Sequence, residues 1–268
     1  MWLRGAARSA GVLAWTLLLL PIQILFLTIS KIVAFHRWPY MVPGLYHRGA
    51  AKIIGLRVTI SGDAITDAPV LYVANHLSWL DIIALGSVLD AGFVAKKEVA
   101  SWPGFGLLAR LQGSVFVDRS RQKTKSETIR ISAIMASGRS LVLFPEGTSS
   151  DGTEILPFRS SFLSVAEQSS KLSILHVQPV SITYVRRAGI PLEDADMPGI
   201  AWYADMTLLP HLWQFFCASG RTDVTLSFHP QADLTDLKSR KALAQYCQGA
   251  VAEGVARARR DARTTPAS

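Results

Sequence analysis

Hydrophobic positions divide the chain into two parts. In the first part, no charged residue occurs between Arg8 and Lys31, and the apolar run matches the ~20 residues that a helix needs to cross a bilayer. A second, partly apolar helix is expected over residues 43–56, which a proline starts and a glycine stops. Residues 1–56 are therefore predicted to form a pair of membrane-associated helices.

The second part, from Arg57 onwards, alternates short β-rich runs with helical stretches. Strands are expected at RVTISG, PVLYVAN, GFVAK, SVFV, LVLF, DVTLSF and, as one long strand or a pair, ILHVQPVSITYV. Helices are expected over about 79–89, 121–137, 160–169 and 238–258, with a broken helix at VASWPGFGLLARL. This alternation predicts an α/β domain over residues 57–256, with a mixed, largely parallel sheet flanked by helices. The basic tail, residues 257–268, is expected to be disordered.

Composition supports a globular domain with an attached membrane segment. Hydrophobic residues make up 49% of the 268 residues, which is high for a soluble enzyme and low for a polytopic membrane protein. The apolar run lacks a small-residue cleavage site, so it is interpreted as an uncleaved anchor. Its C-terminal flank is the richer in Lys and Arg, which places the following domain in the cytoplasm. Pro21 and Gln23 interrupt the run, so a re-entrant or interfacial helix is the alternative.

Net charge bears on the kind of partner, and the cysteines bear on metal binding. The formal charge of +8 favours an anionic partner, and the apolar N-terminus favours lipid over nucleic acid, for which no motif occurs. Neither Cys217 nor Cys247 belongs to a C-x-x-C pair. No zinc or redox site is therefore predicted, and we expect no metal.

The segment PVLYVANHLSWLD contains a candidate base and its partner. His76 follows an apolar strand, Ser78 has the form of a helix N-cap, and Trp79 begins a helix. His76 and Asp81 would point about 140° apart on one continuous helix, so they can meet only if His76 precedes the helix. The carboxylate of Asp81 then accepts the Nδ1 proton, and Nε2 remains as a general base.

The chain lacks a G-x-S-x-G elbow, so the nucleophile is predicted to come from the substrate. A bound hydroxyl that His76 deprotonates could attack a thioester directly. Three alternatives remain open. Ser78 and Asp81 also match a capping box, which would make Asp81 structural. The same pair acting on water would make a hydrolase, and a catalytically silent membrane scaffold would not need the pair.

Two more strand ends carry candidate binding residues. GSVFVDR ends in Arg119, which could clamp an anionic headgroup or a cofactor phosphate, or form a surface salt bridge. LVLFPEGTSSDG runs from a strand into a loop whose backbone N–H groups could bind an oxyanion or phosphate. Gly147 allows close approach there, and Glu146 faces the same sheet edge. Alone, this loop could be an ordinary turn.

Together these segments resemble the glycerolipid acyltransferase family, the group that contains bacterial 1-acylglycerol-3-phosphate acyltransferases. NHLSWLD is similar to its H-x-x-x-x-D box, GSVFVDR to its second motif, FPEGT to its third and VQPVSITY to its fourth, in that order within residues 55–230. The resemblance implies an acyl groove, an acyl-ACP or acyl-CoA co-substrate with no bound cofactor, and a place at the bacterial inner membrane. It also implies that His76 is the base and Asp81 its partner. The substrate-binding residues implied in the same way are Arg119, Glu146, Gly147, Thr148 and Pro179.

One departure concerns the acceptor. Family members that use phosphate-bearing lysolipids commonly have Arg after the Gly–Thr of the third motif, whereas this chain has Ser149. Loss of the guanidinium removes a bidentate phosphate partner. FVAKKEVASWPGFGLLARLQGSVFVDR and AWYADMTLLPHLW look closest to a subgroup that includes lyso-ornithine lipid acyltransferases, whose acceptor has an amino-acid headgroup without phosphate. The predicted reaction is therefore conversion of lyso-ornithine lipid to ornithine lipid, with conversion of lysophosphatidate to phosphatidic acid as the alternative.

The remaining polar candidates receive simpler interpretations. His176, His211 and His229 have no matching Asp and are interpreted as structural, while His36 and His47 are expected at the membrane interface. The helix at 121–137 carries several Lys and Arg residues. It is interpreted either as a solvated face or as a docking surface for the acidic carrier protein or anionic lipid.

Overall fold

The structure is a computed structural model that describes residues 1–32, 38–118, 124–166, 176–233, 236–237 and 239–264. Two N-terminal helices, α1 (Trp2–Ile32) and α2 (Trp38–Ile54), precede an α/β region. Its strands are β1 (Leu56–Ser61), β2 (Val70–Ala74), β3 (Ala91–Lys96), β4 (Val115–Val117), β5 (Ser140–Leu143), β6 (His176–Arg187), β7 (Ile190–Pro191) and β8 (Thr222–Phe228). Its helices include α3 (Leu80–Val88), η1 (Lys97–Ser101), α4 (Phe105–Leu111), α5 (Thr124–Ala136), η2 (Ser160–Leu163), η3 (Asp194–Gly199), α7 (Leu208–Cys217) and α8 (Arg240–Thr264).

The strands form one sheet in the order β1-β8-β6-β2-β5-β3-β4, with β7 paired to β6. Every pair from β6 across to β4 is parallel, whereas β8 runs antiparallel to β6 and parallel to β1. The predicted mixed, largely parallel sheet is confirmed. ILHVQPVSITYV contributes one long strand, β6, rather than a pair.

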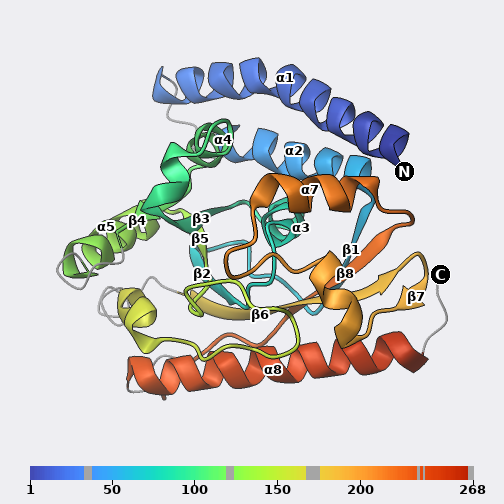
Figure 1. Ribbon diagram of the computed structural model, residues 1–268. Helices are drawn as coiled ribbons and strands as arrows, with labels where there is room; N and C mark the ends of the chain where they lie inside the picture. The colour runs from blue at the N-terminus through green and yellow to red at the C-terminus, as the bar shows by residue number, and fades with distance from the viewer. Residues whose placement is uncertain (33–37, 119–123, 167–175, 234–235, 238, 265–268) are drawn as a thin grey trace.

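Alternating side chains of the strands build a separate core on each face of the sheet. On β2, Tyr72 and Ala74 belong to the core between the sheet and α2, α3 and α7. Leu71 and Val73 belong to the core on the other face, between the sheet and α5 and α8. Helices therefore cover both faces of the sheet, as expected for strands that are buried on both sides. Figure 1 shows this layering, with α8 below the sheet and α2, α3 and α7 above it.

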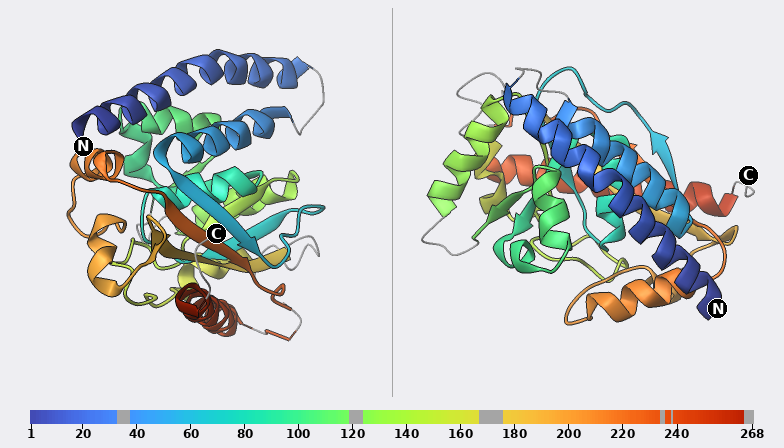
Figure 2. Two further views of the ribbon diagram at one scale, coloured as in Figure 1. Left: turned by 90° about the vertical axis from the view of Figure 1, so that its right-hand side faces the viewer. Right: turned by 90° about the horizontal axis from the view of Figure 1, so that it is seen from above.

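Helix α1 lies against the outside of the helices that cover the sheet (Figures 1 and 2). Arg8 donates to the carbonyl of Ala218 at 3.1 Å, Trp15 to that of Tyr46 at 3.1 Å, and the Gln23 amide to that of Leu111 at 2.7 Å. These bonds attach α1 to the rest of the molecule over about 22 Å of its length. The outward side of α1 is apolar and exposed at Leu13, Leu17, Leu18, Ile22, Ile24 and Leu25.

The C-terminal segment differs from the prediction. Residues 257–264, expected to be disordered, continue α8 to Thr264. The reason is that Ala258 and Ala262 form a small buried cluster with Val185 of β6, while arginines occupy the opposite side of the helix. Residues 265–268 lie outside the described part of the chain.

Parallel strands bring distant segments to one edge of the sheet. β2, β5, β3 and β4 all run in the same direction, so their carboxyl ends meet at the same edge. In open α/β sheets, ligands bind outside these carboxyl ends. The NHLSWLD segment, the PEGT loop and the segment after β3 all begin at this edge.

Candidate active site

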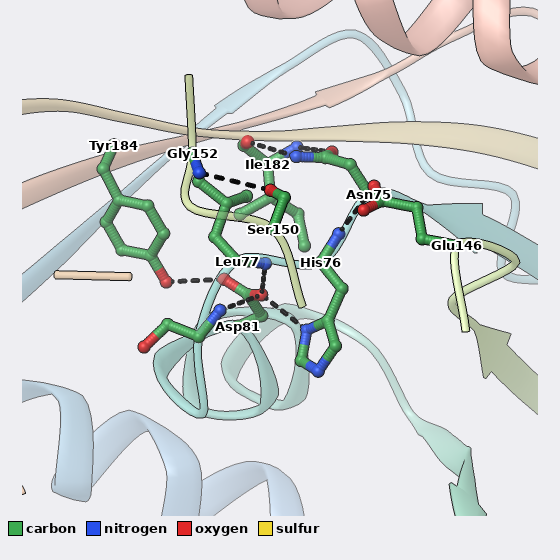
Figure 3. Close-up of polar contacts among 10 residues, drawn as sticks. Asn75, His76, Leu77, Asp81, Glu146, Ser150, Gly152, Ile182 and Tyr184 are labelled. Atoms are coloured by element: carbon green, nitrogen blue, oxygen red, sulfur yellow. Dashed lines mark hydrogen bonds and ion pairs between the residues drawn. The ribbon is translucent and has the colours of Figure 1, made fainter. Parts of the chain in front are cut away.

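His76 and Asp81 form the predicted pair. The Nδ1 atom of His76 lies 2.8 Å from Oδ2 of Asp81. The side chain of Asp81 is fully buried, while that of His76 keeps 20% of its surface exposed. Because a carboxylate accepts hydrogen bonds, Nδ1 carries the imidazole proton and Nε2 is left with its lone pair. Figure 3 shows the second ring nitrogen pointing away from the carboxylate.

Asp81 also fixes the backbone of the loop that carries His76. Its Oδ2 accepts from the backbone N–H groups of Leu77 at 2.7 Å and Ser78 at 2.9 Å. The Ser78 cap expected from the sequence is wrong: α3 begins at Leu80 without a side-chain cap. The carboxylate of Asp81 instead reaches back to the N–H groups of Leu77 and Ser78, which precede the helix. The capping and orienting interpretations of Asp81 are therefore compatible with each other.

Tyr184 of β6 completes the environment of Asp81. Its hydroxyl donates to Oδ1 at 2.7 Å, so four donors converge on one buried carboxylate. Burial, and then the nearby charge of Asp81, raises the pKa of Tyr184 well above its ordinary value. Tyr184 therefore keeps its proton at working pH and remains a donor. Sequence reasoning missed this residue, because its contact with Asp81 spans 103 positions.

The imidazole of His76 is held from two further sides. Its ring stacks on Phe144, with centroids 4.2 Å apart and planes at 15°. Its backbone N–H donates to Oε1 of Glu146 at 3.2 Å, and its carbonyl accepts from Ser150 at 2.8 Å. The end of β2 and the loop after β5 are thereby joined, so the PEGT loop positions the base.

Glu146 itself is buried rather than facing the cavity, with 2% of its surface exposed. Burial raises the pKa of Glu146 to about 8, against backbone hydrogen bonds from His76 and Leu156 that lower it, while the charge of Asp81 raises it. Glu146 is thus largely protonated at neutral pH. This geometry indicates that Glu146 supports His76 from behind, rather than binding substrate as the resemblance implies.

A cavity of about 700 Å³ opens beside His76. Its lining is mainly apolar and comes from α1, α2, α3, β3, α4 and the loops after β5 and before α7. Trp79 forms part of the wall next to the base, where its indole N–H donates to Nδ1 of His211 at 3.1 Å. His211 is therefore structural, as predicted. A cavity of this volume and polarity can hold an apolar part of a ligand beside His76.

Of the remaining predicted binding residues, Gly147 and Thr148 line this cavity, together with Ser149. Gly147 has φ of +78°, a conformation that favours glycine. Pro179 instead lies inside the sheet, opposite Val73 of β2, and is buried away from the lining. Arg119 and His36 lie outside the described residues, as do Arg121 and Lys123 of the basic helix expected over 121–137.

His47 also differs from the prediction. It was expected at the membrane interface, but it is buried between α2 and α3, where Nε2 lies 3.1 Å from Oε1 of Gln112. Burial lowers the pKa of His47 to about 4, so this ring is neutral at working pH. It lines the same cavity as His76 without a carboxylate partner among the described residues.

Two charged residues at the cavity were not singled out as site residues by sequence reasoning. Lys96 ends β3 and Glu98 follows in η1, and both line the cavity. Sequence reasoning could have found them from their place at, or just after, the carboxyl end of β3, which lies at the same edge of the sheet as His76. Among the described residues, no group of three or more His, Cys, Asp or Glu side chains is placed to hold a metal ion.

Comparison with known proteins identifies the family of this chain. The acyltransferase family profile matches residues 56–183. The chain is 39% identical over 244 residues to a protein of Rhizobium meliloti (strain 1021) named lyso-ornithine lipid O-acyltransferase, covering 90% of this chain and 82% of that one. This chain belongs to the acyltransferase family. A protein of the same name from Brucella abortus (strain 2308) is 36% identical, with 90% of both chains covered.

A solved structure shares the fold. The crystal structure of the 1-acyl-sn-glycerophosphate acyltransferase from Thermotoga maritima matches with a TM-score of 0.55 and 22% identity, covering 93% of this chain and 97% of the other. Membership of the acyltransferase family implies a lysolipid acceptor and an acyl thioester donor. Within the described part of the chain, one helix, over Trp2–Ser30, is long and apolar enough to cross a membrane. Membrane association is consistent with that helix and with the lipid substrates of the family.

Proposed function

We propose that this acyltransferase transfers a fatty acyl group from acyl-ACP or acyl-CoA to the free hydroxyl of lyso-ornithine lipid, giving ornithine lipid. The main observation behind this proposal is that His76, bonded to the carboxylate of Asp81, lies at the wall of an apolar cavity. Support for the acceptor comes from the names of the relatives that match about 90% of the chain, and from Ser149 in the cavity lining. A serine there offers no guanidinium to a phosphate.

The proposed chemistry is one direct transfer. Nε2 of His76 takes the proton of the acceptor hydroxyl as its oxygen attacks the thioester carbonyl carbon. The carbon–sulfur bond then breaks, and the departing thiolate takes the proton back from His76. Asp81 orients the imidazole and stabilises its positive charge between the two proton transfers. The loop of Gly147, Thr148 and Ser149 lies beside His76, where it could hold the oxyanion of the intermediate.

Attachment to the cytoplasmic face of the bacterial inner membrane is part of the same proposal. The bonds of Arg8, Trp15 and Gln23 hold α1 along the catalytic region. They would break if α1 turned away from this region to cross the bilayer perpendicular to its plane. We infer that α1 lies flat in the interface with its exposed leucines in the acyl layer. Because α1 and α2 also line the cavity, an acyl chain can pass from the membrane towards His76.

The test is product analysis with purified enzyme in vesicles, offering lyso-ornithine lipid and lysophosphatidate separately, each with acyl-ACP and with acyl-CoA. The proposal predicts ornithine lipid as the main product. Phosphatidic acid as the main product would overturn the acceptor assignment. Free fatty acid released at the same rate without any acceptor would indicate a thioesterase that uses the same pair on water.

A further inference from the structure

The two segments with the subgroup resemblance meet at the cavity. Trp102 comes from the first segment, between η1 and α4, and Trp202 from the second, before α7. Their ring centroids lie 6.0 Å apart with planes at 82°, and both rings line the cavity. Segments separated by 100 positions therefore build one aromatic corner.

Hydrogen bonds connect this corner to the catalytic loop. The backbone N–H of Trp202 donates to the carbonyl of Leu77, directly after His76, at 2.8 Å. The indole N–H of Trp202 donates to the carbonyl of Met206 at 2.7 Å. Because that N–H is already used, Trp202 offers a ligand its aromatic surface rather than a donor. These bonds fix the position of Trp202 relative to His76.

Two side chains of opposite charge lie among the described residues of the cavity lining. Among the described residues that line it, Lys96 and Glu98 are the two whose side chains carry a full charge, and both are exposed. A phosphate monoester, with one to two negative charges, would meet Lys96 but also the like charge of Glu98. A zwitterion would have an opposite charge to meet at each position. Ser149 lies in the same lining, so the third-motif loop adds no cation.

We propose that Trp102, Trp202, Glu98 and Lys96 form a subsite for a zwitterionic amino-acid headgroup. The inference rests on the proposed function, which it deepens by naming the groups that choose the acceptor. The free ammonium of the ornithine headgroup lies against the tryptophan faces and pairs with Glu98. The headgroup carboxylate pairs with Lys96. With the headgroup held there, the acceptor chain extends along the lining towards His76.

The test compares two acceptors that differ in one charge. Lyso-ornithine lipid and its N-acetylated derivative, in which the free amine is blocked, are assayed in vesicles for kcat/KM. The wild type is expected to prefer the acceptor with the free ammonium, called the charged acceptor below, by about tenfold, as one ion pair with cation–π contact allows. Glu98→Gln should lose most of this preference by lowering kcat/KM for the charged acceptor alone. Glu253→Gln, on the exposed surface of α8, is the matched control and should keep the preference.

The aromatic contribution has its own pair of variants. Trp102→Leu should lower the preference for the charged acceptor several-fold, because an aliphatic side chain has no ring quadrupole. Trp102→Phe keeps an aromatic face and should restore part of the preference. A role in packing alone would lower kcat/KM for both acceptors equally in Trp102→Leu.

Failure of the subsite and failure of the proposed function give different results. Equal kcat/KM for the two acceptors in the wild type, or equal losses for both in Glu98→Gln, would overturn the subsite while leaving ornithine lipid synthesis intact. No acyl transfer to either acceptor would instead overturn the proposed function. A wild type that prefers the charged acceptor, with the preference lost in Glu98→Gln, supports both.

Discussion

Two histidines line the same cavity, and their surroundings differ. His76 is bonded to the fully buried carboxylate of Asp81 and keeps part of its ring exposed. His47 is buried against the amide of Gln112, and burial lowers its pKa to about 4. An amide partner carries no charge to stabilise an imidazolium, whereas a carboxylate does. Full burial against an uncharged partner therefore leaves His47 a weak base, whereas His76 keeps a partly exposed ring and a carboxylate partner.

The largest effect is expected at the base itself. His76→Ala should lower kcat by about 10³-fold or more, because removal of a general base costs about 10²–10⁴ and the nucleophile is also no longer oriented. Acyl transfer to lyso-ornithine lipid measures the loss, and circular dichroism checks folding. His176→Gln, at a histidine outside the cavity, is the matched control. Near-normal activity of His76→Ala would remove the residue from the mechanism.

Asp81→Asn should reduce kcat by about 10²-fold or more while preserving the shape of the site. The amide can present its NH₂ group to Nδ1, which favours the wrong tautomer of His76, and it carries no charge to stabilise the imidazolium. Asp81→Ala should in addition lower the melting temperature, since it leaves Tyr184 and two backbone N–H groups unpaired. An Asp81→Asn enzyme with wild-type kcat would leave Asp81 with only its capping role.

Tyr184→Phe removes one donor from Asp81 and is expected to lower kcat by about tenfold. The carboxylate becomes more negative without the hydroxyl, which favours the protonated imidazole. The acid limb of the pH–rate profile should therefore move to higher pH. A lower kcat with the profile unmoved would show that Tyr184 contributes only packing.

Glu146→Gln tests the support behind His76 through stability. The pKa of Glu146 is raised from 4.5 to about 8, so the folded state holds a proton that the unfolded state has released. Its contribution to the free energy of unfolding is complete below pH 4.5 and is lost as pH rises through about 8. The slope is at most about 1.4 kcal/mol per pH unit. Urea unfolding at pH 5 to 9 should show a smaller decline for Glu146→Gln than for the wild type; identical slopes would contradict the raised pKa.

The smallest effect on chemistry is expected at the second histidine. His47→Gln should lower kcat less than about tenfold, because a pKa of about 4 makes His47 a weak base and its partner is an uncharged amide. The same transfer assay as for His76→Ala makes the comparison direct. A loss as large as that of His76→Ala would mean that the partner does not distinguish the two rings.

Local sequence predicted much of the fold and the core of the site. The strand at residues 70–74 and the five-residue spacing of His76 and Asp81 are local features, and both occur as expected. The Ser78 cap was predicted wrongly, because α3 begins only at Leu80, after Trp79, and no side chain caps it. The prediction of disorder after residue 256 was wrong, because it rested on the charge of the segment and overlooked the small residues that pack on Val185.

Long-range contacts account for what sequence reasoning missed. Tyr184 meets Asp81 because β6 continues past the end of β2 and places Tyr184 four residues beyond Val180, the partner of Ala74, which no local pattern records. The Trp102–Trp202 pair and the burial of His47 depend on how the helices over the sheet pack together. Such contacts follow from the register of parallel strands, which the sequence leaves open.

The claim that the acceptor hydroxyl attacks the thioester itself can be tested by mixing stoichiometric enzyme with acyl-ACP in the absence of acceptor. Protein mass spectrometry and thiol release are then followed before and after addition of lyso-ornithine lipid. The account predicts no acylated protein and no burst of thiol until the acceptor arrives, when thiol and ornithine lipid form together. An acylated protein that forms first and then passes its acyl group to the acceptor would contradict direct transfer.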